Sequence, residues 1–285
     1  MSALLEVKDL KTYFSSRTGL IKAVDGVSFS IQVGQTVCLV GESGSGKSMS
    51  AWSIMGLIRP PGKIVGGEIL FKGQNLLVYS DKQMQRLRGR EIGMVFQEPM
   101  TSLNPSYTVG FQISEVFKIH QSKLNSAQIK QKSLELLSSV GLDASKYDAY
   151  PFKLSGGQRQ RVVIAMAMAC KPSLLIADEP TTALDVTIQA QILELMQTLQ
   201  KQQHMAMLFI THDLGVVAQL ADVVVVLYKG EVVEKARASD LFNNPKHPYT
   251  QALLEAIPKP GKRKIRLKSV DENTNYLDFA KEIRC

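Results

Sequence analysis

Apolar residues recur along this chain in short blocks that have the length and composition of β-strands. Between residues 4 and 37, apolar and polar positions alternate, as in Leu5-Glu6-Val7 and at 27–31, and glycines interrupt the alternation. Period-two patterning broken by glycine is typical of antiparallel strands. Other blocks are apolar throughout, which predicts strands buried on both faces of a parallel sheet. These blocks are 36–40, 174–177, 205–211 and 223–227, and the last one begins a predicted hairpin with 231–234.

The pattern changes in the middle of the chain. Two further strands are predicted at 66–71 and 92–96, with a basic helical stretch at 81–90 between them. From residue 98 onward the amphipathic stretches 110–120 and 126–140 predict helices, and no strong strand follows until 174. We therefore expect an α/β fold with an antiparallel β subdomain, a parallel-sheet core and a helical insertion at about 98–160. The expected domain covers 1–258, and 259–285 forms a tail.

A glycine-rich loop follows the first buried strand and precedes a predicted helix at 49–57. The order of strand, glycine loop and helix fits the phosphate-binding pattern G-x-x-x-x-G-K-[ST]. Glycines let successive amide groups point into one concavity, and the helix adds the positive end of its dipole. Lys47 is predicted to reach the β- and γ-phosphates, and the Ser48 hydroxyl to ligate Mg²⁺. The loop comprises Gly41, Glu42, Ser43, Gly44, Ser45, Gly46, Lys47 and Ser48.

A second glycine turn, Ser155-Gly156-Gly157-Gln158, runs directly into a predicted helix at 159–170. Ser155 can cap this helix, and the two glycines expose its first amide groups. The turn is therefore either a second phosphate site or a plain turn before a helix. Two phosphate loops in one chain require either another nucleotide or the far side of a nucleotide bound by a partner subunit.

Two buried strands end in polar residues that suit catalysis. Asp178 and Glu179 follow the strand at 174–177, and His212 follows the strand at 205–211. Ligands bind at the carboxyl ends of strands in an open parallel sheet. Asp178 is predicted to hold Mg²⁺, Glu179 to orient an attacking water, and His212 to contact the terminal phosphate. The alternatives are a surface turn for the acidic pair and a structural role for the histidine.

One aromatic pair, Tyr13 and Phe14, is expected to lie in a polar loop. Either ring belongs to the core, or one of them stacks on a flat ligand such as adenine.

Composition narrows the class of protein. The 285 residues are 45% hydrophobic and 21% charged, which is ordinary for a globular domain with a core. The net charge of +8 favours a polyanionic neighbour, namely nucleotide, nucleic acid or an anionic membrane face. No apolar run has the length of a membrane span, and the first residues lack the apolar segment of a signal peptide. Three cysteines, of which Cys38 and Cys170 have apolar sequence neighbours, form no disulfide or metal pattern, so we expect a cytoplasmic setting.

The tail has a basic cluster at 259–268, which is either solvated or in contact with phospholipid headgroups. Its members are Lys259, Lys262, Arg263, Lys264, Arg266 and Lys268.

The ordered set of these motifs resembles the ATPase subunits of ABC transporters. The set comprises the phosphate loop, Gln97, Leu154-Ser155-Gly156-Gly157-Gln158, the strand ending in Asp178-Glu179, Ala183-Leu184-Asp185, and His212. The stretches 23–29, 97–105 and 244–254 resemble the peptide and nickel import branch of that family, and in particular the first of the two ATPases of a dipeptide or oligopeptide importer.

The resemblance implies a role for each matching residue. Residues 41–48 are Walker A, Asp178 is the Walker B aspartate, and Glu179 is the catalytic base. Gln97 contacts Mg²⁺ or water at the hinge to the helical insertion. Ser155 and Gly157 face the γ-phosphate of a nucleotide held by the partner ATPase. Asp185 lies at the dimer seam, His212 is the switch histidine, and Tyr13 or Phe14 stacks on adenine, with Phe14 favoured.

The resemblance also implies ATP and Mg²⁺ as cofactors and a set of partners. These are a second ABC ATPase in a heterodimer, two transmembrane permeases and an extracytoplasmic solute-binding protein, without direct nucleic-acid binding. The chain is expected to be a peripheral protein at the cytoplasmic face of the inner membrane. Members of this branch often continue with a proline-rich extension that holds several cysteines and can bind an iron–sulfur cluster. Only Cys285 is present there, so no cluster is expected.

Two other classes of protein share part of this set of motifs. A soluble ABC ATPase acting on ribosomes or DNA suits the basic charge, but such proteins usually carry two cassettes or a coiled-coil insertion, and this chain has one cassette and no sustained heptads. A P-loop kinase or GTPase leaves the turn at 154–158 unexplained. The sequence leaves the cargo open among dipeptides, longer peptides, glutathione, nickel and antimicrobial peptides.

Overall fold

The computed structural model describes residues 3–17, 19–97, 102–182 and 184–256, together with residues 274, 276, 277 and 279. Within this part of the chain there are two compact units. The first unit comprises residues 1–78 and 208–285, and the second comprises residues 79–207. Each unit has its own buried apolar side chains.

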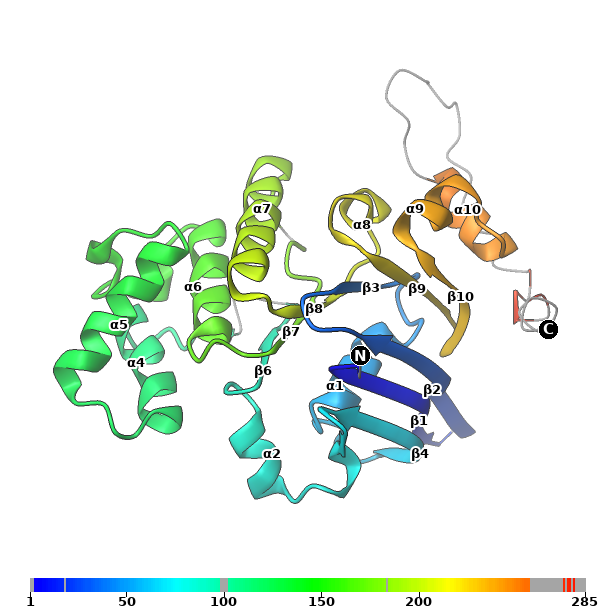
Figure 1. Cartoon of the computed structure of the whole chain (residues 1–285), viewed down its shortest axis with the longest axis horizontal. Helices are drawn as coiled ribbons and strands as arrows, with labels where there is room; N and C mark the ends of the chain where they lie inside the picture. The colour runs from blue at the N-terminus through cyan, green and yellow to red at the C-terminus, as the bar shows by residue number, and fades with distance from the viewer. Residues whose placement is uncertain are drawn as a thin grey trace. The chain divides into compact units, whose positions relative to one another are not determined.

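The first unit contains a four-stranded antiparallel sheet in the order β2-β1-β4-β5, with β1, β2 and β4 side by side in Figure 1. Leu5, Val7 and Leu10 of β1 are buried, and the alternation shifts at a register irregularity between Val7 and Leu10. The sheet confirms the antiparallel strands that period-two patterning predicted. Its strands are β1 (Leu5–Ser16), β2 (Gly19–Ile31), β4 (Gly62–Phe71) and β5 (Gln74–Asn75), and the 3-10 turn η1 (Leu76–Val78) follows.

The expectation that Tyr13 and Phe14 lie in a polar loop is wrong. Both residues belong to β1, where Tyr13 pairs with Lys22 of β2 and Phe14 pairs with Gly62 of β4. The prediction relied on the polar residues around them. The backbone of β1 is hydrogen-bonded to β2 on one side and to β4 on the other, so this segment is a strand even where its side chains are polar. The neighbouring Thr12 is fully buried, and its hydroxyl lies 2.8 Å from the Ser53 hydroxyl.

The first unit also contains a second group of strands, which are neighbours in the order β10-β9-β3-β8. Strand β3 (Thr36–Val40) pairs in parallel with β9 (Val223–Tyr228), and β9 forms the predicted antiparallel hairpin with β10 (Glu231–Arg237). Every residue of β3 is buried, as is every residue of β8 (Ala206–Ile210), whose last three residues belong to this unit. Full burial explains why these strands read as continuous apolar runs.

The helices of the first unit begin where the sequence provides a turn or a cap. Helix α1 (Lys47–Ile54) starts directly after the glycine loop and packs against β1 and β2. Helix α8 (Leu214–Leu220) is capped by the Asp213 carboxylate. The unit is completed by α9 (Ala238–Asn243) and α10 (Pro248–Ala256).

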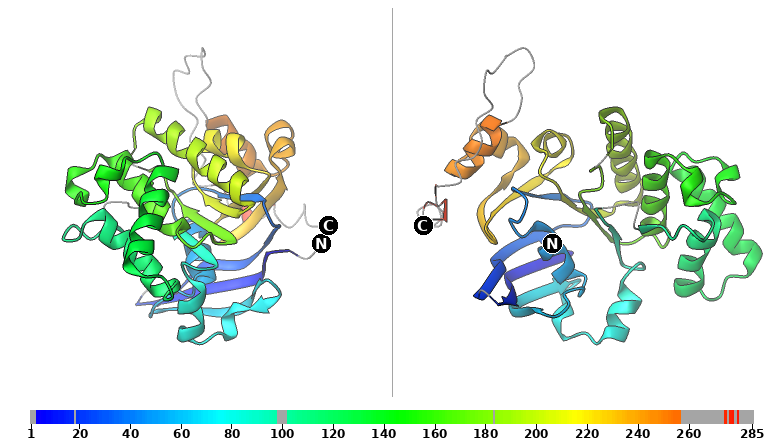
Figure 2. Two further views of the ribbon diagram at one scale, coloured as in Figure 1. Left: turned by 60° about the vertical axis from the view of Figure 1, so that its left-hand side comes forward. Right: turned by 180° about the vertical axis from the view of Figure 1, so that it is seen from behind.

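The second unit combines two parallel strands with helices. Strand β6 (Ile92–Val95) pairs with β7 (Leu174–Asp178) in the register Ile92 to Leu174. Figures 1 and 2 show α4, α5 and α6, drawn in shades of green, side by side. The helices are α2 (Asp81–Leu87), α4 (Val109–His120), α5 (Ser126–Ser139), α6 (Gly156–Met168) and α7 (Val186–Gln203), with 3-10 turns η2 (Ala144–Lys146) and η3 (Pro151–Lys153).

Helices α4 and α5 confirm the helical stretches predicted at 110–120 and 126–140. The described residues between 102 and 168 contain no strand. The bounds of the insertion, about 98–160, stay a prediction, and residues 98–101 lie outside the described part of the chain. The basic cluster at 259–268 and Cys285 also lie outside it.

Two further observations concern the surface and the cysteines. Among the described helices, none combines the length and the apolar character needed to cross a bilayer.

Cys38 is fully buried, as its apolar neighbours predicted. Cys170 is only half-buried, with the Gln121 side-chain nitrogen 4.0 Å from its sulfur, so its surroundings are more polar than expected.

Candidate functional site

The glycine loop between β3 and α1 needs glycine for steric reasons. Gly41, Gly44 and Gly46 have positive φ angles of 149°, 79° and 100°. A Cβ atom at Gly41 would overlap the carbonyl oxygen of Leu227, and one at Gly46 would overlap that of Ala23. The loop therefore lies against the backbone of its own unit, in a conformation that L side chains rarely adopt.

Lys47 lies inside this loop. Its side chain is only 4% exposed, and its amine donates to the carbonyl oxygens of Gly41 at 2.7 Å and Glu42 at 2.8 Å. The Ser45 hydroxyl lies 3.4 Å from the same amine. A buried cation at the start of a helix, in a loop that exposes amide groups, favours an anionic ligand such as a phosphate.

Two segments far away in the sequence brace the loop. The amide of Gly230, in the turn between β9 and β10, donates to the Ser45 carbonyl at 3.0 Å. The amide of Glu42 donates to the Tyr249 hydroxyl oxygen at 3.0 Å. Neither contact was predicted, because no local pattern links residue 249 to residue 42.

Tyr13 and Phe14, the two candidates for stacking on adenine, are both half-buried, and their side chains contact different residues. The Tyr13 hydroxyl donates to the Asp25 carboxylate at 2.6 Å, and this hydrogen bond raises the pKa of Tyr13. Lys22 lies over the Tyr13 ring, 5.5 Å from its centroid. The Phe14 ring lies directly over Gly62, where a Cβ atom would come within 2.5 Å of it. The choice between the two rings stays a prediction.

His212 follows β8 in the first unit and is exposed. The next residue, Asp213, caps α8 by accepting hydrogen bonds from the amides of Gly215 at 2.8 Å and Val216 at 3.4 Å. The cap fixes the end of the strand and the start of the helix, and so the backbone on which His212 lies.

In the second unit, the structure brings Gln97 and Glu179 together. Gln97 follows β6 and Glu179 follows β7, and the side-chain amide of Gln97 donates to the Glu179 carboxylate at 2.9 Å. The Thr182 hydroxyl donates to the same carboxylate oxygen at 3.0 Å. Glu179 has a positive φ of 46°, a strained conformation for a residue with a side chain. Strain of this kind is common at functional sites.

Asp178 is the last residue of β7 and only 2% exposed. Mg²⁺ prefers oxygen ligands, and it is commonly held by one or two carboxylates together with substrate phosphates and water. In the second unit, the Asp178 carboxylate is an oxygen donor of this kind, and in the first unit the Ser48 hydroxyl near the start of α1 is another. No group of three or more His, Cys, Asp or Glu side chains among the described residues could hold a metal without a phosphate.

The second glycine turn begins α6 as predicted, with Ser155 as its cap. The Ser155 hydroxyl accepts from the Gln158 amide at 3.3 Å, and the Gln158 side chain accepts from the Ser155 amide at 3.2 Å. A Cβ atom at Gly157 would meet the Ile188 side chain, so the turn packs against the first turn of α7. Asp185 caps that helix, accepting from the Ile188 amide at 2.9 Å. Ser155, Gly156 and Asp185 are exposed.

The predicted site residues thus divide between the two units. The glycine loop, the aromatic pair and His212 belong to the first unit, whereas Gln97, the turn at 155–158, the acidic pair and Asp185 belong to the second.

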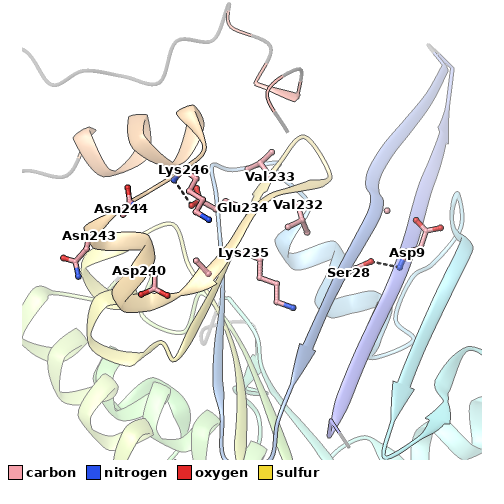
Figure 3. A pocket seen from close by; sticks show the side chains of 12 residues that line it. Asp9, Ser28, Val232, Val233, Glu234, Lys235, Asp240, Asn243, Asn244 and Lys246 are labelled. Atoms are coloured by element: carbon pink, nitrogen blue, oxygen red, sulfur yellow. Dashed lines mark hydrogen bonds between the residues drawn. The ribbon is translucent and has the colours of Figure 1, made fainter. Parts of the chain in front are cut away.

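A cavity of about 970 Å³ in the first unit contains none of the predicted residues (Figure 3). It is lined by β1, β2, β10 and α9, including Asp9, Ser28, Glu234 and Lys235. The cavity is therefore separate from the phosphate loop.

Comparisons with known proteins identify the family of this chain. A family model described as ABC transporter matches residues 24–182, and one described as the C-terminal region of oligopeptide/dipeptide transporters matches residues 233–283. The chain is 52% identical to the dipeptide transport ATP-binding protein DppD of Escherichia coli (strain K12), over 94% of this chain and 82% of that protein. It is 53% identical to the oligopeptide transport ATP-binding protein OppD of Bacillus subtilis (strain 168), over 90% of this chain and 73% of that protein.

Solved structures of ATP-binding cassettes are also similar to this chain. The dimeric structure of the ATP-binding cassette MJ0796 in a post-hydrolysis state, bound to ADP and Pi, matches with a TM-score of 0.74 and 28% identity. The match covers 82% of this chain and 98% of that one. CbiO1 of Clostridium perfringens matches with a TM-score of 0.73 and 29% identity, over 86% of this chain and 92% of that one.

Proposed function

This chain belongs to the ABC transporter family, as the ATP-binding subunit of a dipeptide or oligopeptide importer, and on that premise we propose how its residues divide the work. It is an ABC transporter ATPase. The observation that carries the proposal is the buried Lys47 amine, held within a glycine loop whose geometry admits no side chain at Gly41 or Gly46.

The glycine loop holds the ATP phosphates, with Lys47 placed against the β- and γ-phosphates. Ser48, Asp178 and Gln97 hold Mg²⁺, and the chemistry that this ion supplies is neutralisation of the charge on the phosphate oxygens. One of the rings of Tyr13 and Phe14 stacks on the adenine. The half-exposed position of both rings on β1 supports this assignment.

Glu179 orients the water that attacks the γ-phosphate. Two contacts support this role, since Gln97 and Thr182 both donate to its carboxylate and so fix its direction. The contact from Gln97 also means that a movement of the segment after β6 changes how Glu179 is held. His212 contacts the terminal phosphate from the loop after β8.

The subunit works in a head-to-tail pair of ABC ATPases. Ser155, Gly157 and Asp185 face the nucleotide bound by the partner ATPase, which accounts for two phosphate loops in one chain. The exposure of Ser155 and Asp185 supports this, as does the dimeric state of the MJ0796 cassette. The partner is a second, different ABC ATPase, so that the pair is a heterodimer.

The pair drives two transmembrane permeases, and an extracytoplasmic solute-binding protein delivers the peptide. The chain lies at the cytoplasmic face of the inner membrane, and residues 259–285 follow the ATPase domain in the sequence as a tail. Two exposed aromatic pairs in the second unit, Tyr107 with Phe111 and Tyr150 with Phe152, support a docking role for this unit. ATP closes the pair and hydrolysis reopens it, because the two states differ in their nucleotide contacts.

The substitution Glu179→Gln tests this assignment. The variant keeps the size of the side chain and its hydrogen bonding but removes the charge that orients water. We expect ATP binding to be retained, the closed pair to accumulate in size-exclusion chromatography with ATP, and turnover to fall at least 100-fold. The matched control is Glu194→Gln on the exposed face of α7, which should leave turnover unchanged. Normal turnover in Glu179→Gln would remove Glu179 from its role.

The rival function, action on ribosomes or DNA, is tested by purification. We expect the chain to co-purify with membrane permeases, and enrichment with nucleic acid in place of membrane would favour the rival function.

A further inference from the structure

One peptide group of the phosphate loop is held at both ends. Its carbonyl oxygen, on Gly41, accepts a hydrogen bond from the Lys47 amine at 2.7 Å. Its N–H group, on Glu42, donates to the Tyr249 hydroxyl oxygen at 3.0 Å. A trans peptide is planar, so its carbonyl and its N–H group point in opposite directions. The lysine and the tyrosine therefore fix the plane of this peptide from its two sides, and each bond polarises the other.

Tyr249 is rigidly placed, although it comes from α10, 207 residues further along the chain. Its side chain is 0% exposed, and its ring packs against Tyr228 at 4.6 Å and Tyr276 at 5.4 Å between centroids. The Tyr249 hydroxyl is neutral near pH 7, as burial raises its pKa still further, and its oxygen accepts the amide of Glu42. The position of the hydroxyl is therefore set by the ring packing.

A buried carboxylate sets the first turn of α10. Glu234 on β10 is 6% exposed and accepts hydrogen bonds from the amides of Lys246 at 2.9 Å and His247 at 3.0 Å. The His247 ring nitrogen Nδ1 then accepts from the Tyr249 amide at 3.2 Å. Figure 3 shows Glu234 and Lys246 joined in this way at the wall of the cavity. Glu234 at the cavity wall is thus linked to the phosphate loop by three hydrogen bonds, to His247, from His247 to Tyr249, and from Tyr249 to Glu42.

We propose that Tyr249 is a positioning residue for nucleotide binding, which fixes the Gly41–Glu42 peptide and through it the Lys47 amine, and that Glu234 acts through Tyr249. The inference rests on the proposed function, in which this loop holds the ATP phosphates. Tyr249 affects affinity for ATP and leaves the hydrolytic step unchanged, because it contacts neither the attacking water nor Glu179. Helix α10 then contributes to nucleotide binding indirectly, through the Gly41–Glu42 peptide.

Tyr249→Phe is the central test, because phenylalanine keeps the ring and its packing and removes only the hydroxyl. Loss of this one neutral, part-buried hydrogen bond should weaken binding of a fluorescent ATP analogue by about 3- to 10-fold. The KM for ATP should rise by the same factor, while kcat stays within about twofold. An unchanged affinity, or a fall in kcat without a rise in KM, would overturn the proposal.

Tyr228→Phe is the matched control. Tyr228 belongs to the same aromatic cluster and is 6% exposed, but its hydroxyl donates to the Thr274 carbonyl at 3.2 Å and does not reach the loop. Its affinity for ATP should equal that of the wild type. An equal loss of affinity in Tyr228→Phe and Tyr249→Phe would mean that cluster packing matters rather than the hydroxyl, and would overturn the proposal.

Glu234→Gln tests the second half of the proposal by changing the contacts at the start of α10, and its effect as a single variant can be measured even where Tyr249→Phe unfolds. It should weaken ATP binding in the wild-type background and have no further effect in a Tyr249→Phe background. Additive losses would show that Glu234 does not act through Tyr249.

The wild type and Lys47→Ala separate this inference from the proposed function. If the wild type binds the analogue, Lys47→Ala does not, and Tyr249→Phe binds like the wild type, only the inference fails. If Lys47→Ala binds like the wild type, the proposed function and the inference fail together.

Discussion

Ser155 has two roles that substitution can separate. Its hydroxyl caps α6, accepting from the Gln158 amide at 3.3 Å, and the proposed function also places it at the γ-phosphate of the partner's nucleotide. Ser155→Ala removes both the cap and the phosphate contact. Ser155→Asp keeps the cap, since aspartate caps helices as well as serine does, but it introduces a negative charge next to a phosphate. Ser155→Ala should therefore lose both stability and activity, whereas Ser155→Asp should keep its stability and lose more activity.

The structure sets the size of each effect. Ser155 is exposed and its capping bond is long, so Ser155→Ala should cost about 0.5–1 kcal/mol, at the lower end for a lost cap. This corresponds to a fall of about 1–4 °C in the unfolding midpoint of a chain of this length. Ser155→Asp should keep the midpoint of the wild type. If the aspartate and the partner's phosphate lie about 6 Å apart, the two like charges repel by about 3 kcal/mol at an effective dielectric constant of 20, so turnover should fall about 100-fold.

The assay combines thermal unfolding with ATP turnover of the chain and its partner ATPase. Ser155→Ala should lose turnover by about 10-fold, from one missing hydrogen bond to a charged group. The matched control is Asn125→Ala, which removes the same kind of capping box from α5, where both hydrogen bonds are 2.9 Å long. That control should lose stability but keep turnover. The reasoning is refuted if Ser155→Asp turns over ATP like the wild type, or if Asn125→Ala loses as much turnover as Ser155→Ala.

Two further predictions concern stability. Gly46→Ala should destabilise the chain by about 2 kcal/mol or more in urea unfolding, since the φ of Gly46 is positive and a Cβ would overlap the Ala23 carbonyl oxygen. The control is Gly44→Ala, which should cost less because its Cβ would meet nothing within 4 Å. Equal losses in the two variants would contradict the steric argument. Burial lowers the pKa of His120, so the unfolded chain binds more protons below about pH 6.5 and stability should fall as the pH is lowered through that value. In urea unfolding at a series of pH values, His120→Gln should show a smaller fall than the wild type, and an unchanged fall would exclude His120 as a source.

The motifs that occupy adjacent positions could be predicted from the sequence. The phosphate loop is one continuous segment with a buried strand before it and a helix after it, so its residue types alone specify the local conformation. The same holds for Ser155, because a capping box is closed by residues three apart. The full burial of β3 and β8 could also be predicted from the sequence, because a strand that is buried on both faces is apolar throughout and does not alternate between apolar and polar residues.

Contacts between distant segments were decided only by the tertiary structure. Gln97 meets Glu179 across 82 positions and Glu42 meets Tyr249 across 207, and no local periodicity encodes such distances. Tyr13 and Phe14 were misplaced for the same reason, because their strand is defined by pairing with β2 and β4 and not by their polar neighbours. Local backbone preference and hydrophobic period depend on a few neighbouring residues, whereas strand pairing and side-chain hydrogen bonds depend on which segments the folded chain brings together.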